Sequence, residues 1–115
     1  MANVFFTYYL NDGADSREFE EQILSEVGPR AIAEPSVKQW VLHRTRAWIG
    51  ASEDAPDYVC VVEVDDLERW ATEASASIVD SHGALRSLRR LGLCVSDTAI
   101  HVANDGAREA SDRSP

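Results

Sequence analysis

Residues 4–10 read Val-Phe-Phe-Thr-Tyr-Tyr-Leu, and residues 58–64 read Tyr-Val-Cys-Val-Val-Glu-Val. Both runs are rich in β-branched and aromatic residues, a composition typical of strands. Each run is followed by a helical pattern and then by another extended segment. Two β-α-β units in succession predict an α+β domain, in which one four-stranded antiparallel sheet carries its helices on one face only.

The remaining elements follow from periodicity and from helix-ending residues. Asp15 and Glu18 read as a capping pair for an acidic amphipathic helix over residues 15–27, which Gly28-Pro29 interrupts. Apolar residues then predict a second strand over 37–45. After the third strand, the pattern predicts helical stretches and a last strand, over residues 66–74, 81–91 and 98–102.

The length of 115 residues fits one domain, predicted over residues 1–103, with a polar and disordered tail over 104–115. Because all helices lie on one face of the predicted sheet, the other face needs a cover. A second copy of the chain supplies one, so a homodimer is predicted.

Composition excludes several classes of partner. The net charge is −9, with 11 basic and 20 acidic residues, which argues against nucleic acid and against an anionic membrane surface. No apolar run approaches the roughly 20 residues of a membrane span, and no secretion signal opens the chain, so a cytoplasmic location is predicted. The two Cys and three His residues lack metal-ligand spacing, so no metal site is predicted.

Short motifs spread over residues 3–103 carry a resemblance to a known family. The chain resembles the REDY-like (HapK) proteins, which belong to the dimeric α+β barrel superfamily of ferredoxin-like folds. The matching segments are residues 6–10, 16–20, Pro29, 35–37, 57–59 and 62–64. The resemblance implies a βαββαβ domain that pairs two sheets into a barrel and keeps a pocket between its own sheet and helices.

The same resemblance implies a function in bacterial secondary metabolism. It points to a cofactor-free cyclase that acts on a reactive aromatic intermediate, such as a bis-indole, a pyrrole or a polyketide. Two alternatives stay open, since the superfamily hosts several activities. One is a cofactor-free monooxygenase, and the other is a non-catalytic module that binds a small aromatic molecule.

Strand alternation selects the residues that would bind this aromatic substrate. Successive side chains of a strand point to opposite faces, and alignment to the superfamily turns the even-numbered residues of the first and third strands toward the helices. The same alignment turns Trp40 to the pocket and His43 to the other face, where His43 with its neighbouring arginines would bind a substrate carboxylate or pair with Glu63. A one-residue slip would reverse this assignment. The predicted substrate-binding residues are Phe6, Phe19, Trp40, His43, Tyr58 and Val62.

His82 is the predicted catalytic base, because its position matches that of a catalytic His in cyclases of the superfamily. A neutral imidazole removes protons near neutral pH. Asp80 is predicted to orient the ring, and Tyr8 to hydrogen-bond a developing oxyanion. The opposing interpretation is an exposed His in the first turn of the helix over 81–91, beside its buried stripe, with no function.

Overall fold

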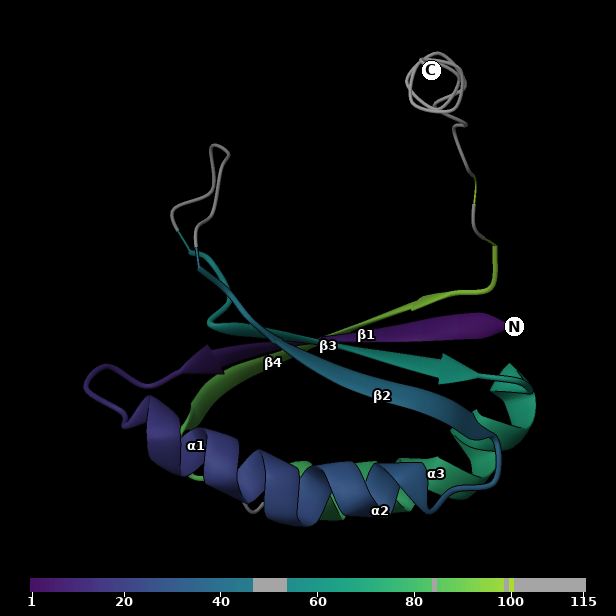
Figure 1. Cartoon of the computed structure of the whole chain (residues 1–115), viewed down its shortest axis with the longest axis horizontal. Coiled ribbons are helices and arrows are strands. Elements are labelled where there is room, and N and C mark those ends of the chain that lie inside the picture. Colours follow the sequence, from purple (N-terminus) through teal and green to yellow (C-terminus); the bar gives the residue numbers. More distant parts are fainter. Residues whose placement is uncertain (47–53, 84, 99, 101–115) are drawn as a thin grey trace, which may run out of the picture.

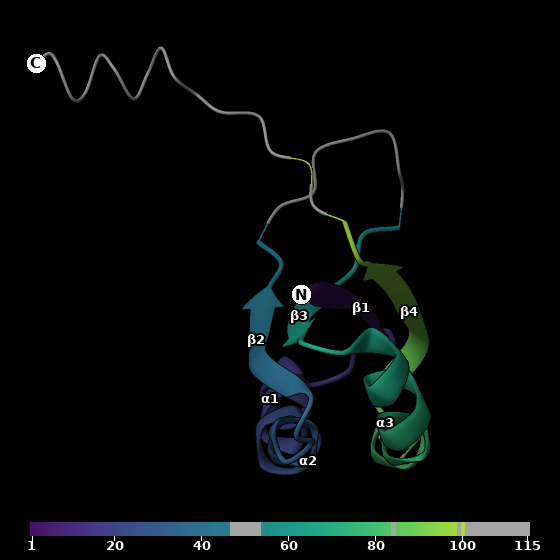
Figure 2. The same ribbon diagram turned by 90° about the vertical axis from the view of Figure 1, so that its right-hand side faces the viewer.

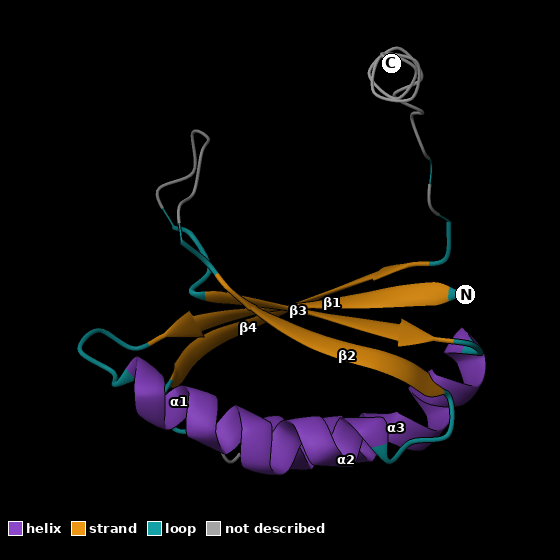
Figure 3. Cartoon of the chain, in the orientation of Figure 1, coloured by secondary structure: helices purple, strands orange, loops and turns teal. Residues whose placement is uncertain are grey.

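The computed structural model describes residues 1–46, 54–83, 85–98 and 100. Within these residues, four strands and two helices follow one another in the order βαββαβ, and a π-helical turn lies within the first helix (Figures 1 and 3). Their bounds, in chain order, are β1 (Ala2–Leu10), α1 (Ser16–Gln22), η1 (Ile23–Val27), α2 (Gly28–Ile32), β2 (Val37–Arg44), β3 (Tyr58–Val64), α3 (Leu67–Gly83) and β4 (Leu88–Ser96).

The strands form one antiparallel sheet in the order β2-β3-β1-β4. Figure 2 shows all the helices on the same side of this sheet, with α1 and α2 below β2 and with α3 below β4. The predicted ferredoxin-like α+β fold with one four-stranded antiparallel sheet is therefore confirmed, and the structure places β1 and β3 at its centre.

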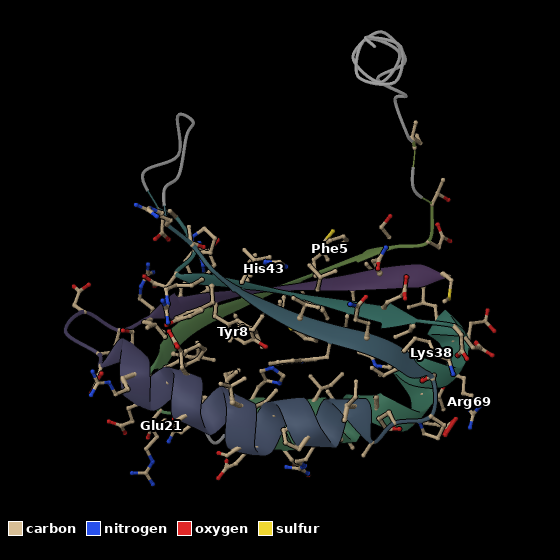
Figure 4. The ribbon with its side chains drawn as sticks, in the orientation of Figure 1. Phe5, Tyr8, Glu21, Lys38, His43 and Arg69 are labelled. Atoms are coloured by element: carbon tan, nitrogen blue, oxygen red, sulfur yellow. The ribbon has the colours of Figure 1, made fainter. Side chains whose placement is uncertain are left out.

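The two faces of the sheet differ in burial. Residues of β1 and β3 alternate strictly between buried and half-buried, and the buried set faces the helices. Phe6 pairs with Cys60, and Tyr8 pairs with Tyr58, so their side chains share the covered face. In Figure 4, Tyr8 lies between sheet and helices, whereas Phe5 and His43 lie on the open side. The covered face is the hydrophobic core, and the open face is one continuous surface.

The first helical segment differs from its prediction at Gly28 and Pro29. The chain stays helical through both residues, because η1 widens the helix by one residue and the Gly28 N–H donates to the Ile23 carbonyl. Proline lacks an N–H and its ring collides with the carbonyl four residues earlier, and a π-turn accommodates both problems. Asp15 does cap the helix as predicted, since its carboxylate accepts a hydrogen bond from the Arg17 N–H.

The prediction for the last third of the chain is wrong in its boundaries. One helix, α3, replaces the two predicted helical stretches, and β4 begins at Leu88, within the predicted second helix. Leu85, Leu88 and Leu91 recur every third residue, which imitates a helix, but residues 91–95 alternate with a period of two, which is the pattern of a strand. His82 therefore lies in the last turn of α3.

Part of the predicted last strand and the whole predicted tail, residues 104–115, lie outside the described residues. Within the part that the structure describes, no helix is long and apolar enough to cross a membrane.

Candidate functional site

A small cavity lies between the covered face of the sheet and the helices. The sheet, the first helix with the turn after it, and α3 form its walls, and the volume of the cavity is about 20 Å³. The sheet contributes Phe6, Trp40 and Val62; η1, α2 and the following turn contribute Val27, Arg30, Ala31 and Glu34; α3 contributes Trp70, Ala74, Ser77, Ile78, Ser81 and His82. The cavity is aromatic and apolar, with its few polar groups concentrated on α2 and α3.

His82 is held in one orientation at the inner end of this cavity. Only 8% of the residue is exposed. Its Nδ1 atom lies 2.8 Å from the Ile78 carbonyl oxygen, one helical turn earlier. Because a carbonyl oxygen can only accept, Nδ1 carries the proton, and the neutral ring presents the lone pair of Nε2. The backbone of α3 thus fixes the tautomer that a general base requires.

Tyr8 occupies that lone pair in the structure. Its hydroxyl oxygen lies 2.8 Å from His82 Nε2, and the phenol therefore donates the hydrogen bond. Tyr8 is fully buried, and burial, with a smaller contribution from Cys60, raises its pKa far above the usual range. Tyr8 remains a protonated donor at any physiological pH.

The electrostatics of His82 favour the neutral ring. Burial lowers the pKa of His82 below its ordinary value of 6.5, and the hydrogen bond to Ile78 offsets part of that decrease. The ring is stacked against Phe6, at 5.2 Å between centroids and 15° between planes, and against Tyr8, at 5.6 Å and 12°. The site therefore holds a neutral base and a neutral acid in a rigid pair at pH 7.

This burial makes the stability of the protein depend on pH in a defined direction. Between the lowered native pKa of His82 and about 6.5, the unfolded chain binds more protons at this position. The free energy of unfolding should therefore decrease as the pH falls below about 6.5, by at most about 1.4 kcal/mol per pH unit from this group. Above about pH 6.5, His82 no longer makes the free energy of unfolding depend on pH.

Urea unfolding of the wild type and of His82→Gln between about pH 5 and pH 7.5 measures this difference. The carboxylates titrate in both proteins, so subtracting the two curves isolates His82. Parallel curves would show that the imidazole titrates normally in the native protein.

The predicted orienting role of Asp80 is not what the structure shows. The Asp80 side chain is exposed, and the Ile78 carbonyl holds the ring instead. The alternative prediction of an exposed His82 is wrong as well. Both corrections have one cause, since His82 ends a long helix rather than beginning a short one, and its side chain points back toward the preceding turn.

Three predicted substrate-binding residues lie away from the cavity lining. Phe19 is fully buried between Tyr8 and Tyr58, with ring centroids 5.5 and 4.8 Å away. The Tyr58 phenol donates to Glu20 on α1, and Arg44 pairs with the same carboxylate through two hydrogen bonds of 2.8 Å. His43 is exposed on the open face, as the strand alignment predicted. Phe6, Tyr8, Trp40, Val62 and His82 are the predicted residues that meet at or directly behind the cavity.

The sequence interpretation missed the α3 side of the cavity. Trp70, Ala74, Ser77 and Ser81 line it together with His82. Their spacings of three and four residues follow one face of a helix, and that signal becomes visible only when residues 67–83 are treated as a single helix.

Comparisons with known proteins identify relatives of this fold. The family model described as "REDY-like protein HapK" matches residues 2–83. Among curated proteins, no sequence matches the chain.

Solved structures that are similar to the chain share little sequence with it. HapK from Hahella chejuensis is 18% identical, with a TM-score of 0.60 over 90% of this chain and 100% of that one. A mutant of SnoaB from Streptomyces nogalater, described as a cofactor-independent oxygenase, is 15% identical, with a TM-score of 0.66 over 90% and 96%. A dimeric ferredoxin-like protein of unknown function from Thermobifida fusca is 13% identical, with a TM-score of 0.58 over 86% and 90%. At these identities, the likeness shows the fold alone.

Proposed function

This chain belongs to the REDY-like HapK family, and from that membership we propose that it is a cofactor-independent cyclase acting on a reactive aromatic intermediate of bacterial secondary metabolism. The observation that carries the proposal is the neutral His82–Tyr8 pair at the end of an aromatic cavity. A positioned base contributes about 10²- to 10⁴-fold to a proton transfer, and the lowered pKa of His82 keeps the imidazole in its unprotonated, reactive form at pH 7.

In the proposed reaction, His82 Nε2 accepts a proton from an acidic C–H or N–H of the bound substrate. The incoming group replaces the Tyr8 hydroxyl at Nε2. The displaced hydroxyl then needs an acceptor on the bound substrate, because a buried donor without a partner costs about 1–3 kcal/mol. The substrate anion closes its ring, and the imidazolium returns the proton, so the cyclised product is an isomer of the substrate. The stacked Phe6 and Tyr8 rings keep the imidazole in place throughout.

Substrate entry requires one wall of the cavity to move, because the free space holds little more than one water molecule. The wall formed by α2 is suited to this movement. It is only five residues long and follows the π-turn, and Gly28 meets the Trp40 ring without a side chain of its own. A Cβ atom at Gly28 would already lie 3.4 Å from that ring, at the tight limit of ordinary contact. An aromatic substrate would therefore separate α2 from Trp40.

A second candidate activity uses the same residues. If the substrate is an electron-rich phenol, deprotonation by His82 yields an anion that reacts directly with O2. One oxygen atom enters the ring as a carbonyl, two hydrogen atoms leave the substrate, and the second oxygen atom is released as water, which would make the protein a cofactor-free monooxygenase. SnoaB, a protein of similar fold, is described as a cofactor-independent oxygenase, which makes this activity the alternative to test. The two candidates differ in whether oxygen is consumed.

We also infer that two copies of the chain pair through the open face of the sheet. Four apolar or aromatic residues on that face are half-buried in the single chain: Phe5, Tyr9, Val59 and Val61. One similar structure is described as dimeric. A sedimentation mass equal to the 12.7 kDa of a single chain would contradict the pairing.

Product profiles by liquid chromatography and mass spectrometry separate the candidate functions. The protein is incubated with oxidised bis-indole and aromatic polyketide intermediates, in air and without oxygen, beside a control without protein. We expect an isomeric product that forms equally in both atmospheres. A product that has gained one oxygen atom and lost two hydrogen atoms, formed only in air, would establish the monooxygenase. An unchanged profile across the panel would contradict both activities and favour a binding module.

A further inference from the structure

Two serine side chains one helical turn apart on α3 reach the same cavity as His82. Ser77 and Ser81 both line it, and only 4% of Ser81 is exposed. A hydroxyl in a lining that is mostly aromatic and apolar is costly to bury unless a partner satisfies it. The partner of Ser81 therefore indicates what the hydroxyl does.

Ser81 shares its hydrogen-bond acceptor, the Ile78 carbonyl, with His82. Its Oγ atom donates to the Ile78 carbonyl at 3.2 Å, while His82 Nδ1 donates to the same oxygen at the shorter distance of 2.8 Å. If the Ser81 hydroxyl turned away, the Ile78 carbonyl would keep the hydrogen bond from His82 and remain satisfied. Ser81 is thus a buried donor that can be redirected at low cost, directly beside the proposed base.

From this arrangement we propose that Ser81 donates a hydrogen bond to an oxygen atom of the substrate, with Ser77 one turn before it completing the contact. The inference rests on the proposed function and narrows its substrate class to aromatic molecules that carry a carbonyl or phenolic oxygen. An oxygen-free pyrrole or indole would leave the redirected hydroxyl without an acceptor.

The chemistry of the site gives this contact a purpose. When His82 removes a proton next to a carbonyl group, negative charge develops on the carbonyl oxygen. A donor directed at that oxygen stabilises the charge as it forms. Arg30 also lines the cavity, from α2, but its side chain is exposed, and the movement proposed for α2 would carry it away. Ser81 stays with His82 on one helix.

Ligand binding tests the proposal without any turnover. The probes are 1-indanone and indane, which share one bicyclic skeleton and differ in the carbonyl oxygen. The readout is the tryptophan fluorescence of the protein, since two of its three tryptophans, Trp40 and Trp70, lie in the cavity wall. The wild type should bind 1-indanone about fivefold more tightly than indane, the effect of one net hydrogen bond. Ser81→Ala should lose this preference while keeping its affinity for indane.

Ser25→Ala is the matched control, because Ser25 is an exposed helical serine outside the cavity, and it should keep the preference. Ser81→Cys keeps the side chain near its size with a weak donor, and should also lose the preference if Ser81→Ala does not fold. A preference unchanged in both Ser81 variants would overturn the role of Ser81 and leave the proposed function standing. Failure of the wild type to bind either probe would overturn the cavity as an aromatic site, and the inference with it.

Discussion

His82→Gln is expected to lower kcat by at least about 100-fold, which is the lower limit of what a positioned general base contributes. Glutamine can still accept from the Tyr8 hydroxyl and donate to the Ile78 carbonyl, so the two buried partners of His82 remain satisfied. What the amide cannot do is take a proton at neutral pH. Initial rates of product formation under saturating substrate measure the change.

His43→Gln provides the matched control for this variant. The same substitution is made on the open face of the sheet, where the side chain is exposed and cannot reach the cavity. We expect the His43→Gln variant to turn over the substrate at the wild-type rate. If His82→Gln retained more than about a tenth of the wild-type kcat, the imidazole would not be the base, because such a loss is smaller than proton transfer to a positioned base explains.

Phe19→Ala is expected to destabilise the protein by about 3–5 kcal/mol, the cost of removing a fully buried aromatic side chain. Phe19 has no exposed surface and fills the space between Tyr8 and Tyr58. Its loss would leave a cavity that these two rings cannot fill, since the Tyr8 hydroxyl is tied to His82 and the Tyr58 hydroxyl to Glu20. A domain of this size is stable by only about 5–15 kcal/mol, so the loss is a large part of the total.

Urea unfolding of Phe19→Ala beside Leu24→Ala measures this effect. Leu24 lies on the same helical segment, but 57% of it is exposed, and its truncation should change the free energy of unfolding by less than about 0.5 kcal/mol. Similar losses in the two variants would show that the helical segment does not pack on the sheet as described. A change in substrate affinity without a loss of stability would return Phe19 to the binding role first predicted for it.

The central strands were predictable from sequence because each carries its own evidence. The β-branched and aromatic residues of β1 and β3 indicate strands by composition alone. The alternation of buried and half-buried side chains agrees with the face that the family resemblance implied. β4 gives a conflicting signal. From Leu85 to Leu91, a leucine recurs at every third residue, as it could on one face of a helix. Only the pairing with β1 decides between helix and strand.

The candidate site was predictable in part for a similar reason. Tyr8 and His82 were both recognised as chemistry-bearing residues, but their contact joins positions 74 residues apart and depends on where α3 ends. The group that orients His82 is a backbone carbonyl, which no side-chain pattern reveals. Asp80 was the nearer carboxylate in sequence, yet helical geometry turns it to solvent.

The proposed mechanism depends most on a neutral His82 whose Nε2 accepts a hydrogen bond from Tyr8, and nitrogen NMR of the histidine side chains tests this directly. At pH 7, we expect one histidine with a protonated Nδ1, an unprotonated Nε2 and a pKa below 6.5, and the spectrum of His82→Gln should lack that signal. A His82 that carries its proton on Nε2, or that titrates at or above its ordinary pKa, would contradict the proposed base.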